Sequence, residues 1–197
     1  MTEEKLIARA QTGDINAFRQ LVRQTQQSLY HFAYDLTGNH HDAEDLSQEV
    51  YLRMHRHLHK FRGDAKVTSW LFRIAVNTNI SKHRKKAFKA LTFVETMDDG
   101  SISTGRSSSA WETNPEKHAE RSIMQSHIQS ALQSLSLRER SVFSLRHYRD
   151  LPLKEIAAIM GITEGTVKST LFRSIRKLQK RLEDYREEIG TETGGIS

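Results

Sequence analysis

Residues 153–177 constrain the fold of this chain more than any other segment. The apolar periodicity predicts two short helices that meet at Gly161, with Thr163 as the N-cap of the second. Helices that cross steeply over a turn of three to four residues need a small side chain at the crossing, a turn residue that tolerates positive φ, and apolar anchors on both sides. Ala157 and Gly161 meet the first two needs, and the anchors are Ile156, Ile162 and Val167. We therefore predict a helix-turn-helix.

The outward face of its second helix carries hydrogen-bond donors and one aromatic ring. Arg and Lys side chains suit guanine edges in the DNA major groove, and apolar groups suit the thymine methyl. We predict that this face binds duplex DNA; the alternative is a helical hairpin with a solvated basic face. The candidate residues are Lys168, Ser169, Phe172, Arg173, Arg176 and Lys177.

Residues 4–86 predict a compact bundle of about four helices. A short first helix ends at Gly13, and a longer one begins near Asn16 and stops at Gly38. A third helix opens at Asp42, and a fourth runs from about residue 67 to residue 86 after a turn at residues 61–64. In the third helix an apolar residue recurs every four positions, which is the pattern of a buried face, at Leu46, Val50, Met54 and Leu58.

Between and after the helical segments the composition changes. Residues 87–122 are low in apolar side chains and rich in small polar ones, so we expect a flexible linker. Residues 123–186 regain helical periodicity as a second, smaller domain, and residues 187–197 are expected to form a disordered tail. The predicted fold class is therefore all-α, with two small helical domains, 1–86 and 123–186, joined by the linker.

The net charge of +6 is unevenly distributed along the chain. Residues 46–86 hold ten basic and two acidic residues, a balance that suits phosphate neutralisation; a solvated basic face is the alternative. In the fourth helix, Trp70, Arg73, Asn77 and Arg84 could stack an unpaired base, hydrogen-bond its edge and hold its backbone. Ordinary core packing of Trp70 and a plain surface amide at Asn77 remain alternatives.

An acidic and amide patch lies on the third predicted helix. Asp45, Gln48 and Glu49 stand at i, i+3 and i+4, so they share one face beside the apolar stripe. We interpret them as a protein-docking surface. The alternative is that carboxylates near the start of a helix merely favour its dipole.

Several classes of protein do not fit the sequence. The chain has no cysteine, which rules out disulfides and thiol-based zinc or redox sites. No apolar run approaches membrane-span length, and the acidic start does not resemble a signal peptide, so we expect a cytoplasmic protein.

The sequence also argues against metal binding and catalysis. His57 lies on the opposite side of its helix from His55 and His59, so these three histidines cannot bind one metal ion together. No catalytic motif is present, so we expect no enzyme activity, cofactor, metal or small-molecule substrate.

Together the two halves resemble the bacterial RNA polymerase sigma factors of the extracytoplasmic-function (ECF) class. Residues 42–53 are similar to their region 2.2, and residues 61–63 and 70–77 to regions 2.3 and 2.4. Asn114-Pro115-Glu116 is similar to the segment ahead of region 4, and residues 153–161 and 164–169 to region 4 itself. The chain departs from the family pattern at Ser81, where Asp is usual, and at Asp150-Leu151-Pro152-Leu153, where an entry of the type Gly-Leu-Ser-Tyr is usual.

The resemblance implies roles for these residues. Asp45, Gln48 and Glu49 would bind the clamp of the largest subunit of core RNA polymerase, and the second domain would bind the flap of the second-largest. Asn77 would meet a flipped base of the promoter. The full set implied for the melted minus-10 element is Phe61, Trp70, Arg73, Asn77, Arg84, Lys85 and Lys86.

In the second domain, the resemblance implies a reader of the minus-35 element. Lys168, Ser169, Phe172 and Arg173 would contact bases, and Arg176 and Lys177 would contact phosphates. The linker would thread through the polymerase. The resemblance also implies an anti-sigma factor as partner, which would hold the protein at the inner face of the membrane when it is not associated with the nucleoid. The competing hypothesis is a conventional helix-turn-helix regulator that binds duplex DNA without polymerase.

Overall fold

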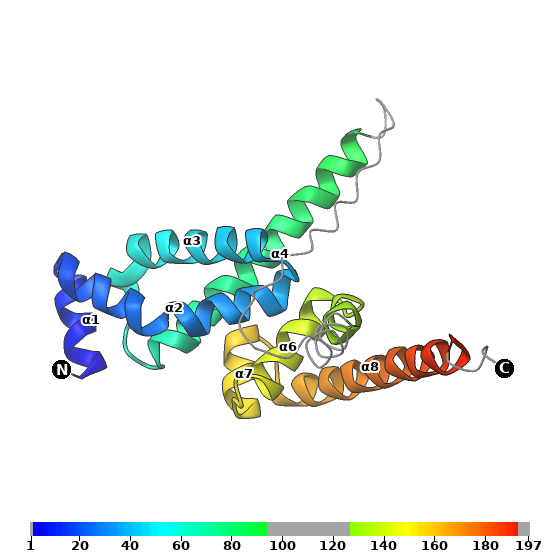
Figure 1. Ribbon diagram of the computed structural model, residues 1–197. Coiled ribbons are helices and arrows are strands. Elements are labelled where there is room, and N and C mark those ends of the chain that lie inside the picture. Colours follow the sequence, from blue (N-terminus) through cyan, green and yellow to red (C-terminus); the bar gives the residue numbers. More distant parts are fainter. Residues whose placement is uncertain (1, 94–126, 193–197) are drawn as a thin grey trace, which may run out of the picture. The chain divides into compact units, whose positions relative to one another are not determined.

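The computed structural model describes residues 2–93 and 127–192 (Figure 1). In these ranges every regular element is a helix, which confirms the predicted all-α class. The chain divides into two compact units, Met1–Ser107 and Ser108–Ser197, and each is described by itself. None of the described helices is long and apolar enough to cross a membrane.

The first unit is the predicted bundle of four helices with one additional 3-10 turn. Asp14 caps the second helix by accepting hydrogen bonds from the backbone N–H groups of Asn16 (2.9 Å) and Ala17 (3.1 Å), so the cap lies two residues before the predicted one. Gly38, at φ 83°, ends that helix as predicted. The elements are α1 (Glu3–Gln11), α2 (Ile15–Thr37), α3 (His40–His57), η1 (Leu58–Lys60) and α4 (Val67–Phe93).

The core of this unit lies where α2 and α3 run side by side and α4 crosses them (Figure 1). Leu46, Val50 and Met54 are fully buried, so the predicted stripe of the third helix is its core face. Phe32 of α2 packs against Phe72 of α4 with ring centroids 4.7 Å apart. Each fully buried side chain of this size contributes about 1.5–3 kcal/mol. The bundle thereby fixes the outward faces of α3 and α4.

The fourth helix is longer than predicted. It continues to Phe93, so residues 87–93, which were expected in the linker, are helical. The physical reason is that residues 87–91 are mostly good helix formers, and neither Gly nor Pro follows Lys86 for several turns. The rest of the expected linker, from residue 94, lies outside the described residues.

The second unit begins with helical residues 127–133, followed by α6 (Leu137–His147), α7 (Leu153–Met160) and α8 (Glu164–Glu192). Gly161 ends α7 at φ 65°, and Thr163 Oγ1 accepts a hydrogen bond from the Thr166 N–H (3.2 Å), which confirms the predicted helix-turn-helix. Residues 187–192, expected in a disordered tail, continue α8 instead. Residues 123–126 and 193–197 lie outside the described residues.

Two apolar clusters hold this unit together. Val142, Leu145, Ile156 and Val167 are fully buried where α6, α7 and α8 meet. A second cluster joins residues of the first helical segment to Leu178 of α8; its other members are Ala131, Leu132 and Leu135. The helix-turn-helix is therefore held from both sides, and the outward face of α8 has a fixed orientation within the unit.

Candidate nucleic-acid and protein-docking surfaces

The buried side chains of α8 identify its inward face, and the exposed side chains between them form its outward face. Val167, Thr170, Ser174 and Leu178 face inward, and the predicted DNA-binding residues of α8 are exposed between them. Phe172 is 59% exposed, and the guanidinium carbon of Arg176 lies 4.8 Å from the centre of its ring. An exposed aromatic ring flanked by cations can contact a thymine methyl while the cations contact phosphates. The structure thus brings together the predicted side chains on one exposed face.

Lys177, one of the cations of this face, is held in an ion pair within its own unit. Its Nζ lies 2.9 Å from both carboxylate oxygens of Glu139, a buried residue of α6. Burial alone would raise the pKa of Glu139, but the hydrogen bonds from Lys177 and Ser136 hold that pKa below its ordinary value. Much of the charge of Lys177 is therefore neutralised within the protein.

An aromatic pair stands at the start of α4. The rings of Phe61 and Trp70 lie with centroids 4.9 Å apart, and both side chains are partly exposed. At about 100° per residue, Arg73, Asn77 and Arg84 fall within about 60° of Trp70 around the helix. All three are exposed. This face offers an aromatic platform, an amide and two cations in one row, which is the chemistry that an unpaired strand requires.

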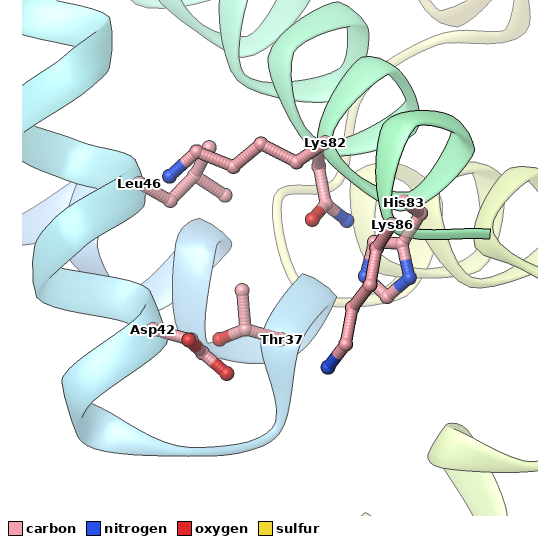
Figure 2. Close-up of a pocket in the computed structure, with 7 residues that line it drawn as sticks. Thr37, Asp42, Leu46, Lys82, His83 and Lys86 are labelled. Atoms are coloured by element: carbon pink, nitrogen blue, oxygen red, sulfur yellow. The ribbon is translucent and has the colours of Figure 1, made fainter. Parts of the chain in front are cut away.

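Lys86 does not lie on this face. It stands about 160° around the helix from Trp70, and it lines a pocket of about 220 Å³ between α4 and the corner where α2 meets α3. Figure 2 shows Lys82 extending from α4 across to Leu46 of α3, while Lys86 extends on the side of the pocket where Thr37 lies. The structure therefore separates Lys86 from the other residues predicted for the melted strand. Lys85 is exposed, about 60° from Trp70.

The predicted docking patch lies on the face of α3 opposite its core stripe. The side chain of Asp45 is 53% exposed, and Gln48 is exposed beside it. Glu49 accepts a hydrogen bond from Arg53 Nε at 2.7 Å, which lowers the pKa of its carboxyl despite the opposing effect of partial burial. Of the two carboxylates, Asp45 is the more available to a partner.

The sequence analysis missed an exposed apolar residue beside this patch. Leu52 is 55% exposed and stands seven residues after Asp45, on the same side of α3. A large apolar side chain that faces away from the core is a common feature of protein-binding surfaces. The signal was present in the sequence, because Leu52 is out of phase with the stripe of buried residues.

Metal ligation has no support in the described part of the chain, where no group of three or more His, Asp or Glu side chains converges. His55, one of the three neighbouring histidines, packs instead edge-on against Phe18 with ring centroids 5.2 Å apart.

Both units are similar to known proteins. Residues 21–89 match the family model described as Sigma-70 region 2, and residues 131–180 match Sigma-70, region 4. The chain is 30% identical over 184 residues to the ECF RNA polymerase sigma factor SigW of Bacillus subtilis, with 93% of the chain and 98% of that protein covered. It is 30% identical over 189 residues to the ECF RNA polymerase sigma-E factor of Escherichia coli, covering 93% and 95%.

Two solved structures share the fold. One is the sigma factor RpoE in complex with the anti-sigma factor NepR from Bartonella quintana (TM-score 0.65, 23% identity, 86% of this chain and 98% of that one). The other is CnrH in complex with the cytosolic domain of CnrY (TM-score 0.64, 21% identity, 92% and 97%).

Proposed function

The chain belongs to the ECF group of RNA polymerase sigma factors, and we propose a division of labour between its helical surfaces on that premise. As a sigma factor it binds core RNA polymerase and directs promoter-specific initiation; sigma factors are not enzymes. The observation that carries the residue-level proposal is that one chain holds both a helix-turn-helix for duplex DNA and an aromatic, amide and cation row suited to an unpaired strand. A conventional duplex-binding regulator needs only the first.

In this proposal the minus-35 element is recognised by α8. Lys168, Ser169, Phe172 and Arg173 contact base edges, and Arg176 contacts a phosphate. Lys177 adds little to phosphate binding while Glu139 holds it.

The melted minus-10 strand binds along α4 of the first unit. Phe61 and Trp70 stack on a base, Asn77 hydrogen-bonds the edge of a flipped base, and Arg73 and Arg84 hold the backbone. Lys85 adds a further cation on the same side of α4, and Lys86, on the other side of the helix, contacts a more distant phosphate.

Core polymerase docks on α3 through Asp45, Gln48 and Glu49, with Leu52 as an apolar contact beside them. We assign the clamp of the largest subunit to this surface and the flap of the second-largest to the second unit. We also propose an anti-sigma factor as the controlling partner, by analogy with the RpoE–NepR complex, and a cytoplasmic site of action.

The test is promoter-directed transcription from a library of genomic fragments, in which core polymerase is supplied with the purified chain and the transcripts are sequenced. We expect discrete start sites that core polymerase alone does not use. The double variant Asp45→Lys with Glu49→Lys should weaken core binding by about tenfold or more. Glu4→Lys, the same change at an exposed position of α1, is the matched control. Binding to promoter duplex that neither needs nor responds to core polymerase would favour the conventional regulator instead.

A further inference from the structure

We infer that α1 positions the loop of residues 61–66, and that Glu3 and Gln11 are its positioning residues. The inference rests on the proposed role of Phe61 and Trp70 in binding the unpaired minus-10 strand. It concerns a helix for which the sequence analysis predicted no role, and it explains how the strand-binding surface is preorganised before DNA binds.

Gln11, the last residue of α1, holds the beginning of the loop. Its side-chain Nε2 donates hydrogen bonds to the backbone carbonyls of Leu58 (3.0 Å) and Phe61 (2.7 Å), which lie 47 and 50 residues away in sequence. One amide group therefore fixes two carbonyls, that of the first residue of η1 and that of the residue directly after η1. Since the Phe61 backbone is fixed, its ring is directed toward Trp70.

Glu3, the first residue of α1, holds the end of the same loop. Its carboxylate Oε1 accepts a hydrogen bond from the backbone N–H of Val67 at 3.1 Å, across 64 residues of sequence. Val67 is the first residue of α4, whose N-terminal N–H groups have no partner within the helix. A carboxylate here also interacts favourably with the helix dipole. Glu3 thus acts as a cap supplied from another helix.

The helix that supplies both contacts is itself firmly placed. Leu6 is fully buried and Ile7 nearly so. Arg9 Nε donates to Asp14 at 2.9 Å, and Asp14 caps α2. By contrast, residues 62–66 are all exposed, and Gly63 adopts φ 80°. A loop with so little burial of its own takes its position from its two ends, and α1 holds both.

The functional consequence is preorganisation. If the loop were free, binding of the strand would have to order Phe61 and the start of α4, and that cost would be subtracted from the affinity. Removal of either anchor should therefore weaken binding of the unpaired strand. Core docking and duplex binding should be unchanged, because the hydrogen bonds of Glu3 and Gln11 go to Leu58, Phe61 and Val67, and not to the proposed docking residues of α3 or the DNA-binding residues of α8.

The experiment uses the full chain assembled with core polymerase and a fluorescent single-stranded oligonucleotide, selected for binding to the wild-type holoenzyme from a randomised pool. Gln11→Met removes the donor without a change of charge, and we expect the Kd to rise by about tenfold, as for the loss of two neutral hydrogen bonds that are partly exposed. Gln26→Met, at an exposed position of α2, is the matched control and should leave the Kd unchanged.

Glu3→Lys distinguishes positioning from general electrostatics. The added positive charge should strengthen DNA binding if charge alone matters, whereas the loss of the cap should weaken it. Glu4→Lys, the same change one residue later, is the control. Glu3→Gln keeps an acceptor and should bind nearly as wild type. Tighter binding by Glu3→Lys, or unchanged binding by Gln11→Met, would overturn the inference.

Two further measurements distinguish failure of the proposed strand-binding face from failure of the role of α1. Trp70→Ala and Asn77→Ala should weaken strand binding; if they do not, the proposed function of this face fails rather than the role of α1. Hydrogen exchange of the Val67 amide in the free, folded chain should be faster in Glu3→Lys than in Glu4→Lys. Equal exchange in the two variants would contradict the cap without any reference to DNA, and would do so even if Gln11→Met failed to fold.

Discussion

Replacement of Glu139 should separate two interactions that a single side chain makes in the second unit. At the start of α6, Glu139 Oε2 accepts hydrogen bonds from the Ser136 N–H (3.0 Å) and the Ser136 hydroxyl (2.8 Å), which completes a capping box. Both of its oxygens also pair with Lys177 of α8. Glu139→Gln keeps an acceptor for the cap and removes the ion pair, whereas Glu139→Ala removes both.

The solvent exposure of the ion pair and the presence of the helix cap set the expected losses in the free energy of unfolding. The side chain of Lys177 is 53% exposed, so the ion pair contributes about 0.5 kcal/mol. The cap contributes about 1 kcal/mol. We therefore expect Glu139→Gln to lower the free energy of unfolding by about 0.5 kcal/mol and Glu139→Ala by about 1.5 kcal/mol. For a domain of this size, these losses correspond to decreases in Tm of roughly 2–4 °C and 6–12 °C.

Differential scanning calorimetry of the full chain is the assay. Val142→Ala, a change in the core of the second unit, identifies which transition belongs to that unit. If Glu139→Gln melted together with Glu139→Ala, the cap would contribute nothing and the reasoning from the capping box would be refuted.

The ion pair also predicts a pH dependence. Folding lowers the pKa of Glu139 below its ordinary value of 4.5, so its stabilisation is fully present above that value and is lost as the pH falls through the folded pKa. The difference in Tm between wild type and Glu139→Gln should therefore shrink as the pH falls below 4.5 and through the lowered pKa of the folded state. A difference that persisted undiminished in strong acid would show that the carboxylate is not stabilised by folding.

Three further predictions concern Arg140, Asp150 and the pair Arg176 and Lys177 of the second unit. Arg140 is buried and donates to the carbonyls of Leu132 (2.9 Å) and Leu135 (3.1 Å), so Arg140→Met should lower the free energy of unfolding in urea by about 3 kcal/mol. Asp150 adopts φ 50°, and Asp150→Val should therefore be about 1–2 kcal/mol less stable than Asp150→Gly in the same assay. In DNA binding measured across salt concentrations, Arg176→Met should reduce the salt slope by about 0.9, and Lys177→Met by clearly less, because Glu139 already neutralises that lysine.

The helix ends that the sequence predicts well are those with a local chemical cause. Gly38 and Gly161 end their helices in the left-handed region, where glycine is favoured, and Thr163 caps the next helix through its own hydroxyl. Each of these signals lies within a few residues of the boundary that it sets. The same reasoning accounts for the helix-turn-helix, whose spacing is a local property of the chain.

The helix ends that the sequence predicts poorly have no local signal of this kind. A change in composition after Lys86 was interpreted as the end of the fourth helix, but α4 continues through residues with good helix propensity. Gly190 was placed in a tail, yet α8 continues through it. The composition of a segment indicates how much conformational entropy it loses on ordering. It does not locate the residue at which a helix stops.

The same distinction between local and distant causes applies to the functional surfaces. The pairing of Glu49 with Arg53 spans one helical turn and could be recognised in the sequence. The partner of Lys177 lies 38 residues earlier in the chain, and the anchors of the 61–66 loop lie 50 and 64 residues from their partners. A count of basic residues on a helical face treats each charge as available to DNA. Which of them are in fact available depends on carboxylates that only the tertiary fold brings near, so sequence patterns overestimate the number of phosphate contacts and leave positioning residues such as Glu3 unseen.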